Sequence, residues 1–194
     1  MKNNYNDYVF KNGKPIYQFD EMYKNCDDPW NIGKKITESI DYKLITAIIE
    51  KYKMKIEKNR PDILEIGSGK GDFSKILSDL GRVTGVEISP TAINYAIEMN
   101  SKTDAEFICA DITKPDFHLD KKYDFIIFFR VIWYLIDNLD ICLNNLYNSM
   151  TDKGIGIFDI NFYKGEYYGK SVISNTIDYI NFLEKYFTIL EHFE

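Results

Sequence analysis

The 194-residue sequence has no hydrophobic run long enough to cross a membrane, which takes about 20 apolar residues. Its longest run lies around Phe125–Leu135, and Arg130 interrupts it. The amino-terminal residues are polar and lack the apolar stretch of a secretory signal peptide. We therefore expect neither secretion nor insertion into a membrane.

Cysteine and histidine are scarce as well. Cys26, Cys109 and Cys142 are an odd number at wide spacings, which argues against a disulfide framework or a Cys-x-x-Cys zinc site. Two histidines, His118 and His192, are too few for a histidine-rich metal site. We expect no metal ion and a reducing, cytoplasmic location.

Positive charge is in deficit, since 24 Lys and Arg residues face 30 Asp and Glu residues and give a formal net charge of −6. Such a chain has no general basic field to attract nucleic acid. Hydrophobic residues make up 45% and charged residues 28%, a balance typical of globular proteins with a core. Without repeats or low-complexity segments, the length predicts one domain over residues 1–194.

What the sequence does contain is an alternation of strand and helix patterns. Strands are predicted over residues 63–66, 83–88, 105–109, 123–129, 154–160 and 187–192. Helices are predicted over residues 20–26, 37–55, 72–80, 90–100, 138–150 and 173–183. The alternation predicts an α/β fold with a doubly wound, mostly parallel sheet covered on both faces.

A glycine-rich turn, Glu65-Ile66-Gly67-Ser68-Gly69-Lys70-Gly71-Asp72, follows the first of these strands. It is not a phosphate-binding P-loop, because Lys70 is followed by Gly71 instead of serine or threonine. It is a poor dinucleotide fingerprint, because Asp72 stands where the third glycine belongs and would repel a pyrophosphate. The pattern is Glu-x-Gly-x-Gly-x-Gly.

This pattern resembles the nucleotide-binding loop of class I S-adenosylmethionine-dependent methyltransferases, which have a Rossmann-like fold. Two acids at strand ends strengthen the resemblance. Glu87 is placed to accept hydrogen bonds from both ribose hydroxyls, and Asp111 matches the family's acid for the adenine amino group. The resemblance implies S-adenosyl-L-methionine as cofactor and S-adenosyl-L-homocysteine as product. The implied cofactor-binding residues are Trp30, Glu65, Gly67, Ser68, Gly69, Glu87, Ile88, Asp111, Ile112 and Phe129.

One subgroup extends the resemblance toward the amino terminus. Asp28-Pro29-Trp30, together with the segment Phe129–Leu135, looks like the nodulation protein S-like methyltransferases, whose members act on amino sugars. By this resemblance, residues 1–36 form an aromatic lid over the cofactor, with Tyr23 or Trp30 packing near it. The chain departs from the pattern at Arg130, where the subgroup usually has an acid.

The resemblance also bears on the end of the sheet. The family's core ends in an antiparallel hairpin of strands six and seven, whereas only one strand, over residues 187–192, is predicted here. We therefore expect the last strand to be missing, which would leave an unpaired edge.

Three residues are predicted to act on the acceptor. Tyr134 occupies the position where many small-molecule members of the family carry histidine or tyrosine, so we expect it to be a catalytic, orienting or basic group. Arg130 could grip a carboxylate or phosphate of the acceptor, or it could pair with a structural carboxylate of the chain itself. Tyr163 could line an aromatic acceptor pocket. His118 lies in a charged loop and is expected to be exposed and not catalytic.

The predicted activity is methyl transfer to oxygen or nitrogen of a small polar acceptor, with sugars, nucleotide-linked compounds and phosphorylated metabolites favoured. Two alternatives stay open: an NAD-dependent oxidoreductase or epimerase, and a non-catalytic S-adenosylmethionine-binding protein. Asp72 and the lack of a Tyr-x-x-x-Lys pair argue against the first. No Asp/Asn-Pro-Pro-Tyr motif of DNA methyltransferases follows the fourth strand, so no nucleic-acid substrate is expected. The chain could be a monomer or a homodimer.

Overall fold

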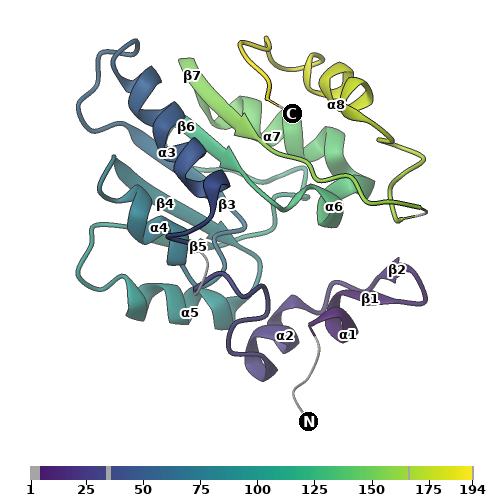
Figure 1. Ribbon diagram of the computed structural model, residues 1–194. Coiled ribbons are helices and arrows are strands. Elements are labelled where there is room, and N and C mark those ends of the chain that lie inside the picture. Colours follow the sequence, from purple (N-terminus) through teal and green to yellow (C-terminus); the bar gives the residue numbers. More distant parts are fainter. Residues whose placement is uncertain (1–4, 34–35, 166, 194) are drawn as a thin grey trace.

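A five-stranded parallel sheet is the centre of the computed structural model, which describes residues 5–33, 36–165 and 167–193 (Figure 1). Its strands are β3 (Asp62–Ile66), β4 (Arg82–Glu87), β5 (Glu106–Cys109), β6 (Tyr123–Phe128) and β7 (Met150–Phe158). They lie in the order β5-β4-β3-β6-β7, and each adjacent pair is parallel. The predicted doubly wound α/β fold is confirmed.

Helices connect the strands and cover the sheet. They are α3 (Ile40–Lys53), α4 (Asp72–Leu77), α5 (Pro90–Met99), α6 (Ile132–Leu135), the 3-10 helix η1 (Ile136–Asn138), α7 (Leu139–Ser149) and α8 (Thr176–Leu183). Because the chain runs outward from β3 through β4 to β5 and then returns to place β6 beside β3, the strand order reverses between β3 and β6. In such sheets a ligand crevice opens at the carboxyl ends of the strands at this point.

Alternate side chains of each strand pack on opposite faces of the sheet. On one face, Phe125 and Ile127 of β6 pack with Ile63 of β3 beneath α3 and α4. On the other face, Ile126 and Phe128 pack with α7. Burial on both faces is why this strand is a continuous apolar run that the sequence alone could identify.

The predicted strand over residues 187–192 is wrong. The ring of Phe187 packs against Phe158 at 5.0 Å and Tyr147 at 6.1 Å, and Glu191 accepts a hydrogen bond from the hydroxyl of Tyr52 on α3 at 2.6 Å. Side-chain contacts with β7, α7 and α3 therefore hold this segment in place, and its backbone forms no strand pairing in the sheet. Within the described residues, the sheet therefore ends at β7, and the unpaired edge belongs to that strand.

The amino-terminal segment lies at one end of the sheet (purple in Figure 1). It contains α1 (Asn6–Val9), the antiparallel strands β1 (Phe10–Lys11) and β2 (Lys14–Pro15), and α2 (Phe19–Asn25). The predicted helix over residues 20–26 is confirmed by α2. Residues 1–4 and 34–35 of the predicted lid lie outside the described residues. In the described part of the chain, no helix combines the length and apolar character that a membrane crossing requires.

Asp20 ties α2 to the start of α5. Its carboxylate accepts hydrogen bonds from the Ser89 hydroxyl at 2.8 Å and the Thr91 backbone N–H at 2.9 Å. A hydrogen bond from Lys24 is the largest of the effects that hold the pKa of Asp20 below its usual value. This carboxylate therefore stays ionised in the folded protein near neutral pH.

Replacing Asp20 by alanine is expected to loosen the amino-terminal segment. The change leaves the Thr91 N–H without its partner, which typically costs about 1–3 kcal/mol. Limited proteolysis should cut residues 5–33 several-fold faster, and the Tm should fall by about 2–6 °C. Glu21→Ala is the matched control, because Glu21 is an exposed acid of the same helix whose side chain pairs with Lys24. Equal proteolysis of the two variants would contradict this role for Asp20.

Candidate active site

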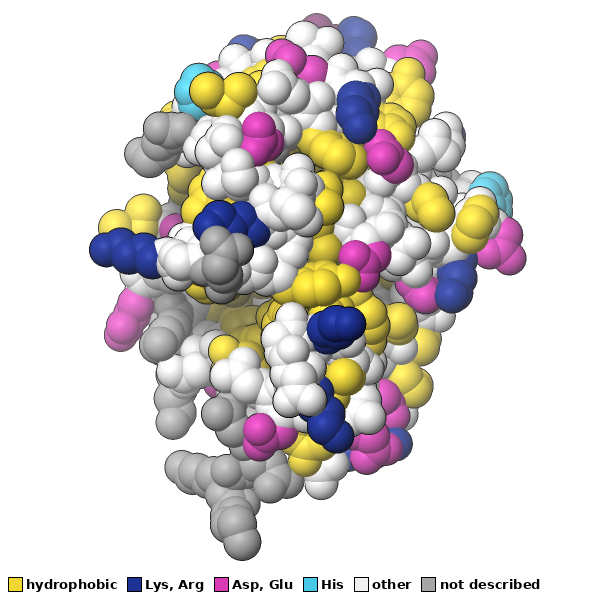
Figure 2. Space-filling view, turned by 90° about the vertical axis from the view of Figure 1, so that its right-hand side faces the viewer, with side chains coloured by type: hydrophobic (Ala, Val, Ile, Leu, Met, Phe, Trp, Pro, Cys, Tyr) yellow, Lys and Arg dark blue, Asp and Glu magenta, His cyan; other side chains and the backbone are white. Residues whose placement is uncertain are grey.

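A cavity of about 740 Å³ lies at the carboxyl ends of the strands, a volume typical of small-molecule sites. Every site residue predicted from the sequence lines it: Trp30, Glu65, Gly67, Ser68, Gly69, Glu87, Ile88, Asp111, Ile112, Phe129, Arg130, Tyr134 and Tyr163. Figure 2 shows the face on which β1, β2 and α6 lie, where hydrophobic side chains reach the surface in a central hollow between charges of both signs. The functional roles of these residues remain predictions.

The glycine-rich turn forms one wall of the cavity. Gly67 and Gly69 have φ angles of +71° and +53°, which L side chains rarely adopt. The N–H groups of Gly67 and Ser68 donate to the Val86 carbonyl at 2.8 and 3.1 Å, so the turn is fixed against β4. A Cβ atom at Gly67 would lie 2.4 Å from Cγ1 of Val131. Glycine is therefore required here by both backbone conformation and space.

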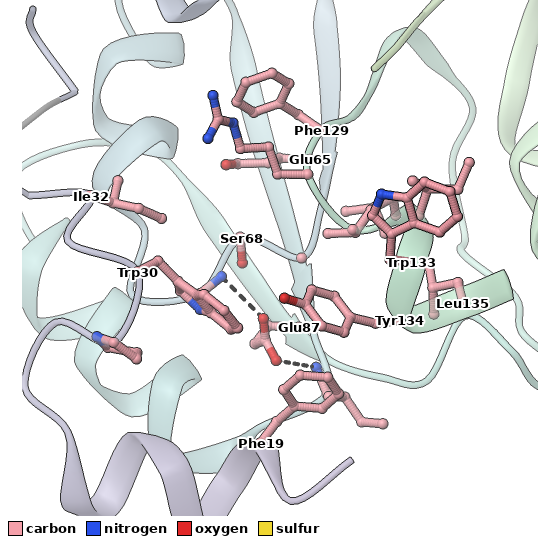
Figure 3. Close-up of a pocket in the computed structure, with 18 of the residues that line it drawn as sticks. Phe19, Trp30, Ile32, Glu65, Ser68, Glu87, Phe129, Trp133, Tyr134 and Leu135 are labelled. Carbon is pink, nitrogen blue, oxygen red and sulfur yellow. Dashed lines mark hydrogen bonds between the residues drawn. The ribbon is translucent and has the colours of Figure 1, made fainter. Parts of the chain in front are cut away.

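Glu87 lies buried at the end of β4, and its carboxylate holds the turn from below. Its oxygens accept backbone N–H groups from Gly69 at 3.1 Å and Ile88 at 2.9 Å (dashed in Figure 3), and from Ser89 at 3.0 Å. Burial raises the pKa of Glu87, and the three N–H donors oppose that rise. A carboxylate offers about four acceptor positions, so this group can also accept from a ligand hydroxyl.

Asp111 follows β5 and lines the same side of the cavity. Its carboxylate accepts from the N–H and hydroxyl of Thr113 at 2.9 and 2.6 Å and lies 3.4 Å from the ammonium of Lys114. Burial alone would raise the pKa of Asp111, but these partners outweigh it and leave the pKa below its usual value. The side chain is thus an ionised acceptor near neutral pH.

Two further acids, Glu65 and Asp72, line the cavity beside the glycine-rich turn. Burial raises the pKa of Glu65 to about 8, and its carboxylate accepts a hydrogen bond from the hydroxyl of Ser74. Burial also raises the pKa of Asp72. A positively charged ligand group near these carboxylates would stabilise their ionised forms. The sequence pattern used Asp72 only as an argument against a pyrophosphate ligand and did not predict it as a residue of the site.

Aromatic side chains of the amino-terminal segment form the opposite wall. The Trp30 ring lies 5.6 Å from that of Tyr134, and the indole N–H donates to the Tyr23 hydroxyl at 3.3 Å. Phe19 contacts Tyr134 edge-on, with ring centroids 5.4 Å apart (Figure 3). Burial raises the pKa of Tyr134 well above its usual value, which favours an orienting role for this hydroxyl over a basic one.

Arg130 occupies a strained turn after β6. Its φ angle is +59°, its guanidinium pairs with Asp41 of α3, and it lies 5.2 Å from the centre of the Phe129 ring. Tyr163 is 60% exposed at the cavity's rim, where its ring lies 6.4 Å from Trp133. A pair with a structural carboxylate was one of the two roles open to Arg130 from the sequence, but Asp41 could not be identified as the partner because the two residues are far apart in the chain.

Asp159 is a lining residue that the sequence analysis missed. It follows β7 directly and accepts a hydrogen bond from the Arg130 N–H at 2.5 Å. The prediction of a strand as far as residue 160 placed Asp159 within the strand, where an acid suggests no ligand. His118, as predicted, is exposed. No group of three His, Cys, Asp or Glu residues that could hold a metal ion is found in the part of the chain that the structure describes.

The polar groups that line the cavity fit a cationic, hydroxyl-bearing nucleoside ligand. The Ser68 hydroxyl is buried and has no hydrogen-bond partner among the described residues. Several carboxylates line the cofactor side of the cavity, among them those of Glu65, Asp72, Glu87 and Asp111. These acceptors suit the hydroxyl, amino and sulfonium groups of S-adenosyl-L-methionine, and they disfavour a ligand with a pyrophosphate.

Comparisons with known proteins point the same way. A family model described as a methyltransferase domain matches residues 57–180. Malonyl-[acyl-carrier protein] O-methyltransferase of Acetivibrio thermocellus is 34% identical over 104 residues, which are 52% of this chain and 36% of that protein. The chain therefore spans little more than a third of the length of this curated relative.

Solved structures share the fold. The N-methyltransferase NodS from Bradyrhizobium japonicum, in complex with S-adenosyl-L-homocysteine, has a TM-score of 0.57 and 21% identity over 73% of this chain and 71% of its own. A TehB-like S-adenosylmethionine-dependent methyltransferase from Corynebacterium glutamicum has a TM-score of 0.62 and 20% identity over 86% and 82% of the two chains. At these identities the likeness concerns the fold.

Proposed function

The chain belongs to the family of methyltransferase domains whose model matches residues 57–180, and from that membership we propose that it methylates oxygen or nitrogen of a small polar acceptor. It is an S-adenosyl-L-methionine-dependent methyltransferase. This membership leaves no support for the alternative of an NAD-dependent oxidoreductase. The observation that carries the proposal is the glycine-rich turn fixed to the buried Glu87 carboxylate at the carboxyl end of the sheet.

The residues on the β3, β4 and β5 side would hold the cofactor. Glu87 would accept from the ribose hydroxyls, Asp111 and Ile112 would contact the adenine, and Glu65 and the glycine-rich turn would take the amino acid portion. When bound, the cofactor supplies a methyl group activated by a sulfonium. The enzyme then needs mainly to position the acceptor and to accept its proton.

The amino-terminal segment covers this site in our proposal. Residues of α2 and of the loop that contains Trp30 line the cavity, and Asp20 anchors them to α5. Trp30 and Tyr23 would exclude water from the methyl group by closing over the cofactor. Exclusion of water protects a reactive group from hydrolysis and strengthens electrostatic contacts inside the site.

The acceptor would lie on the β6 and β7 side, between Tyr134, Arg130 and Tyr163. Sugars, nucleotide-linked compounds and phosphorylated metabolites are the classes we favour. The basic residues of the cavity already have partners: Lys114 pairs with Asp111, Lys70 donates to the Asp27 carbonyl, and Arg130 pairs with Asp41. An anionic acceptor would therefore replace Asp41 as the partner of Arg130. A malonyl acceptor, as in the name of the Acetivibrio relative, would need the same exchange to be bound by this guanidinium.

Titration calorimetry with S-adenosyl-L-homocysteine and, separately, NADH tests the cofactor. We expect micromolar binding of the first and none of the second. An acceptor screen with S-adenosyl-L-methionine and phosphorylated or nucleotide-linked sugars then tests transfer. Binding without methyl transfer to any acceptor would favour a non-catalytic binding protein, and NADH binding would overturn the proposal.

Replacing Arg130 by glycine removes the guanidinium while leaving the backbone turn at this position intact. Glycine adopts a φ of +59° without strain and keeps the N–H that donates to Asp159, so the Tm should be unchanged or higher. For an anionic acceptor, KM should rise about 10-fold or more, because a charged hydrogen bond is lost. Arg60→Ala is the control, since Arg60 pairs with Asp104 at the surface. An unchanged KM would show that the acceptor is not held by this guanidinium.

A further inference from the structure

We propose that Asp159 is a catalytic residue that binds the acceptor's O–H or N–H group and takes its proton, an inference that rests on the proposed function because it concerns the same cavity. Asp159 is the first residue after β7, so its side chain emerges at the carboxyl end of the sheet, and it lines the cavity. It stands at the β7 edge of the sheet, whereas Glu87 and Asp111 follow β4 and β5.

The surrounding residues hold Asp159 from three directions. Its backbone N–H donates to the Phe128 carbonyl at 3.3 Å, and its carbonyl accepts from the Tyr179 hydroxyl at 3.3 Å. One carboxylate oxygen, Oδ1, accepts the Arg130 N–H at 2.5 Å. Among the described residues, no donor is found for Oδ2, which is left to accept from a ligand. A group fixed in this way is positioned before the acceptor arrives.

The charges around Asp159 suit a proton acceptor. Burial raises the pKa of Asp159 to about 6, while the Arg130 N–H and guanidinium oppose the rise and the carboxylate of Asp41 adds to it. Tyr179 also faces this group, and burial keeps its hydroxyl protonated. A carboxylate of this basicity is ionised at neutral pH and is close to the value that favours proton transfer there.

The other candidates in the cavity fit this task less well. Tyr134 keeps its proton at neutral pH because burial raises its pKa. Glu65 has the higher carboxyl pKa, but it is more deeply buried beside the glycine-rich turn and accepts the Ser74 hydroxyl. Asp159 is half-buried and therefore still accessible from the cavity.

The proton balance of the step is simple. The acceptor atom bonds to the methyl carbon as the carbon–sulfur bond breaks, and the electron pair of that bond stays on sulfur. The acceptor's proton passes to the free Oδ2 of Asp159. The carboxylic acid so formed then releases the proton to solvent, and one proton is released for each methyl group transferred.

Asp159→Asn is the informative variant, because its amide oxygen can still accept the Arg130 N–H. Asp140→Asn is the matched control, since Asp140 is an exposed acid of α7 paired with Lys185. The first measurement needs no acceptor: the Tm of the full chain between pH 4 and pH 7. When the pKa of a carboxyl is raised in the folded state, its protonation stabilises the fold, and this stabilisation is lost as the pH rises through that pKa. The Asp159→Asn variant should therefore gain about 3–6 °C over the wild type across this range, and the control should gain nothing.

The second measurement is methyl transfer to the acceptor found in the screen. We expect kcat of Asp159→Asn to fall about 100-fold or more, with loss of the acidic limb near pH 6, while the Kd for S-adenosyl-L-homocysteine stays within twofold. Two results would overturn the inference: pH dependences of Tm that are parallel in variant and wild type, or a kcat within threefold of the wild type. Failure of the wild type to bind S-adenosyl-L-homocysteine would instead refute the proposed function.

Discussion

Replacing Glu87 by alanine is expected to weaken S-adenosyl-L-homocysteine binding by about 10- to 100-fold and to destabilise the fold by about 2–4 kcal/mol. The carboxylate accepts three backbone N–H groups, from Gly69, Ile88 and Ser89, and those of Gly69 and Ser89 would lose their partner in a buried site. The link between β4 and the glycine-rich turn would be lost together with the acceptor proposed for the ribose. Binding and stability should therefore fall together.

Calorimetry and thermal unfolding measure the two effects. Glu106→Ala is the matched control, because Glu106 begins the neighbouring strand β5 but is exposed and contacts Lys121. Its Kd and Tm should remain near those of the wild type. If the Glu87 variant bound S-adenosyl-L-homocysteine with wild-type affinity, Glu87 would not be part of the binding site. The main support for the proposed cofactor position would then be lost.

Replacing Gly67 by alanine should have the second large effect. A left-handed conformation costs an L residue about 1–2 kcal/mol, and the added Cβ would lie 2.4 Å from Cγ1 of Val131. Such overpacking typically costs about 1–3 kcal/mol more. Because the turn or the start of α6 must move, we expect a Tm lower by about 6–12 °C and no measurable S-adenosyl-L-homocysteine binding.

The variant Gly13→Ala distinguishes the backbone strain of a positive φ angle from the steric clash with Val131. Gly13 has a φ angle of +73°, nearly that of Gly67, but a Cβ there would have nothing within 4 Å. This variant should show only the smaller backbone cost and retain binding. If both variants lose the same stability and both bind normally, the contact with Val131 does not shape the turn.

The central strands could be predicted because burial on both faces makes them apolar along their whole length. The amino-terminal hairpin was missed, although Asn12-Gly13 is a strong signal for a two-residue turn between strands. Both residues have positive φ angles, as that turn requires. The short strands carry only two residues each, too few for an alternating pattern to stand out.

The cofactor side of the site was readable because the glycine-rich turn follows β3 directly and Glu87 and Asp111 lie at or just after the ends of the next two strands along the chain. Asp159 was not, because nothing in the sequence marks the end of β7 and its burial depends on Arg130 and Tyr179, which come from other parts of the chain. The strand prediction over residues 187–192 was wrong because the apolar side chains of this segment pack against β7 and α7, a contact between distant parts of the chain that the local pattern does not reveal.

The residues that line the two sides of the cavity come from different parts of the chain. The glycine-rich turn, Glu87 and Asp111 lie in one continuous stretch, 65–114, whereas the remaining walls come from residues 5–42 and 129–168. Recombination between relatives at two junctions could therefore exchange the outer walls and leave the central stretch whole. A chimera that keeps residues 43–128 of this chain is expected to retain the contacts proposed for the ribose and adenine, while its acceptor preference follows the donor of the outer segments. On this arrangement, new acceptors can evolve without rebuilding the part that binds the methyl donor.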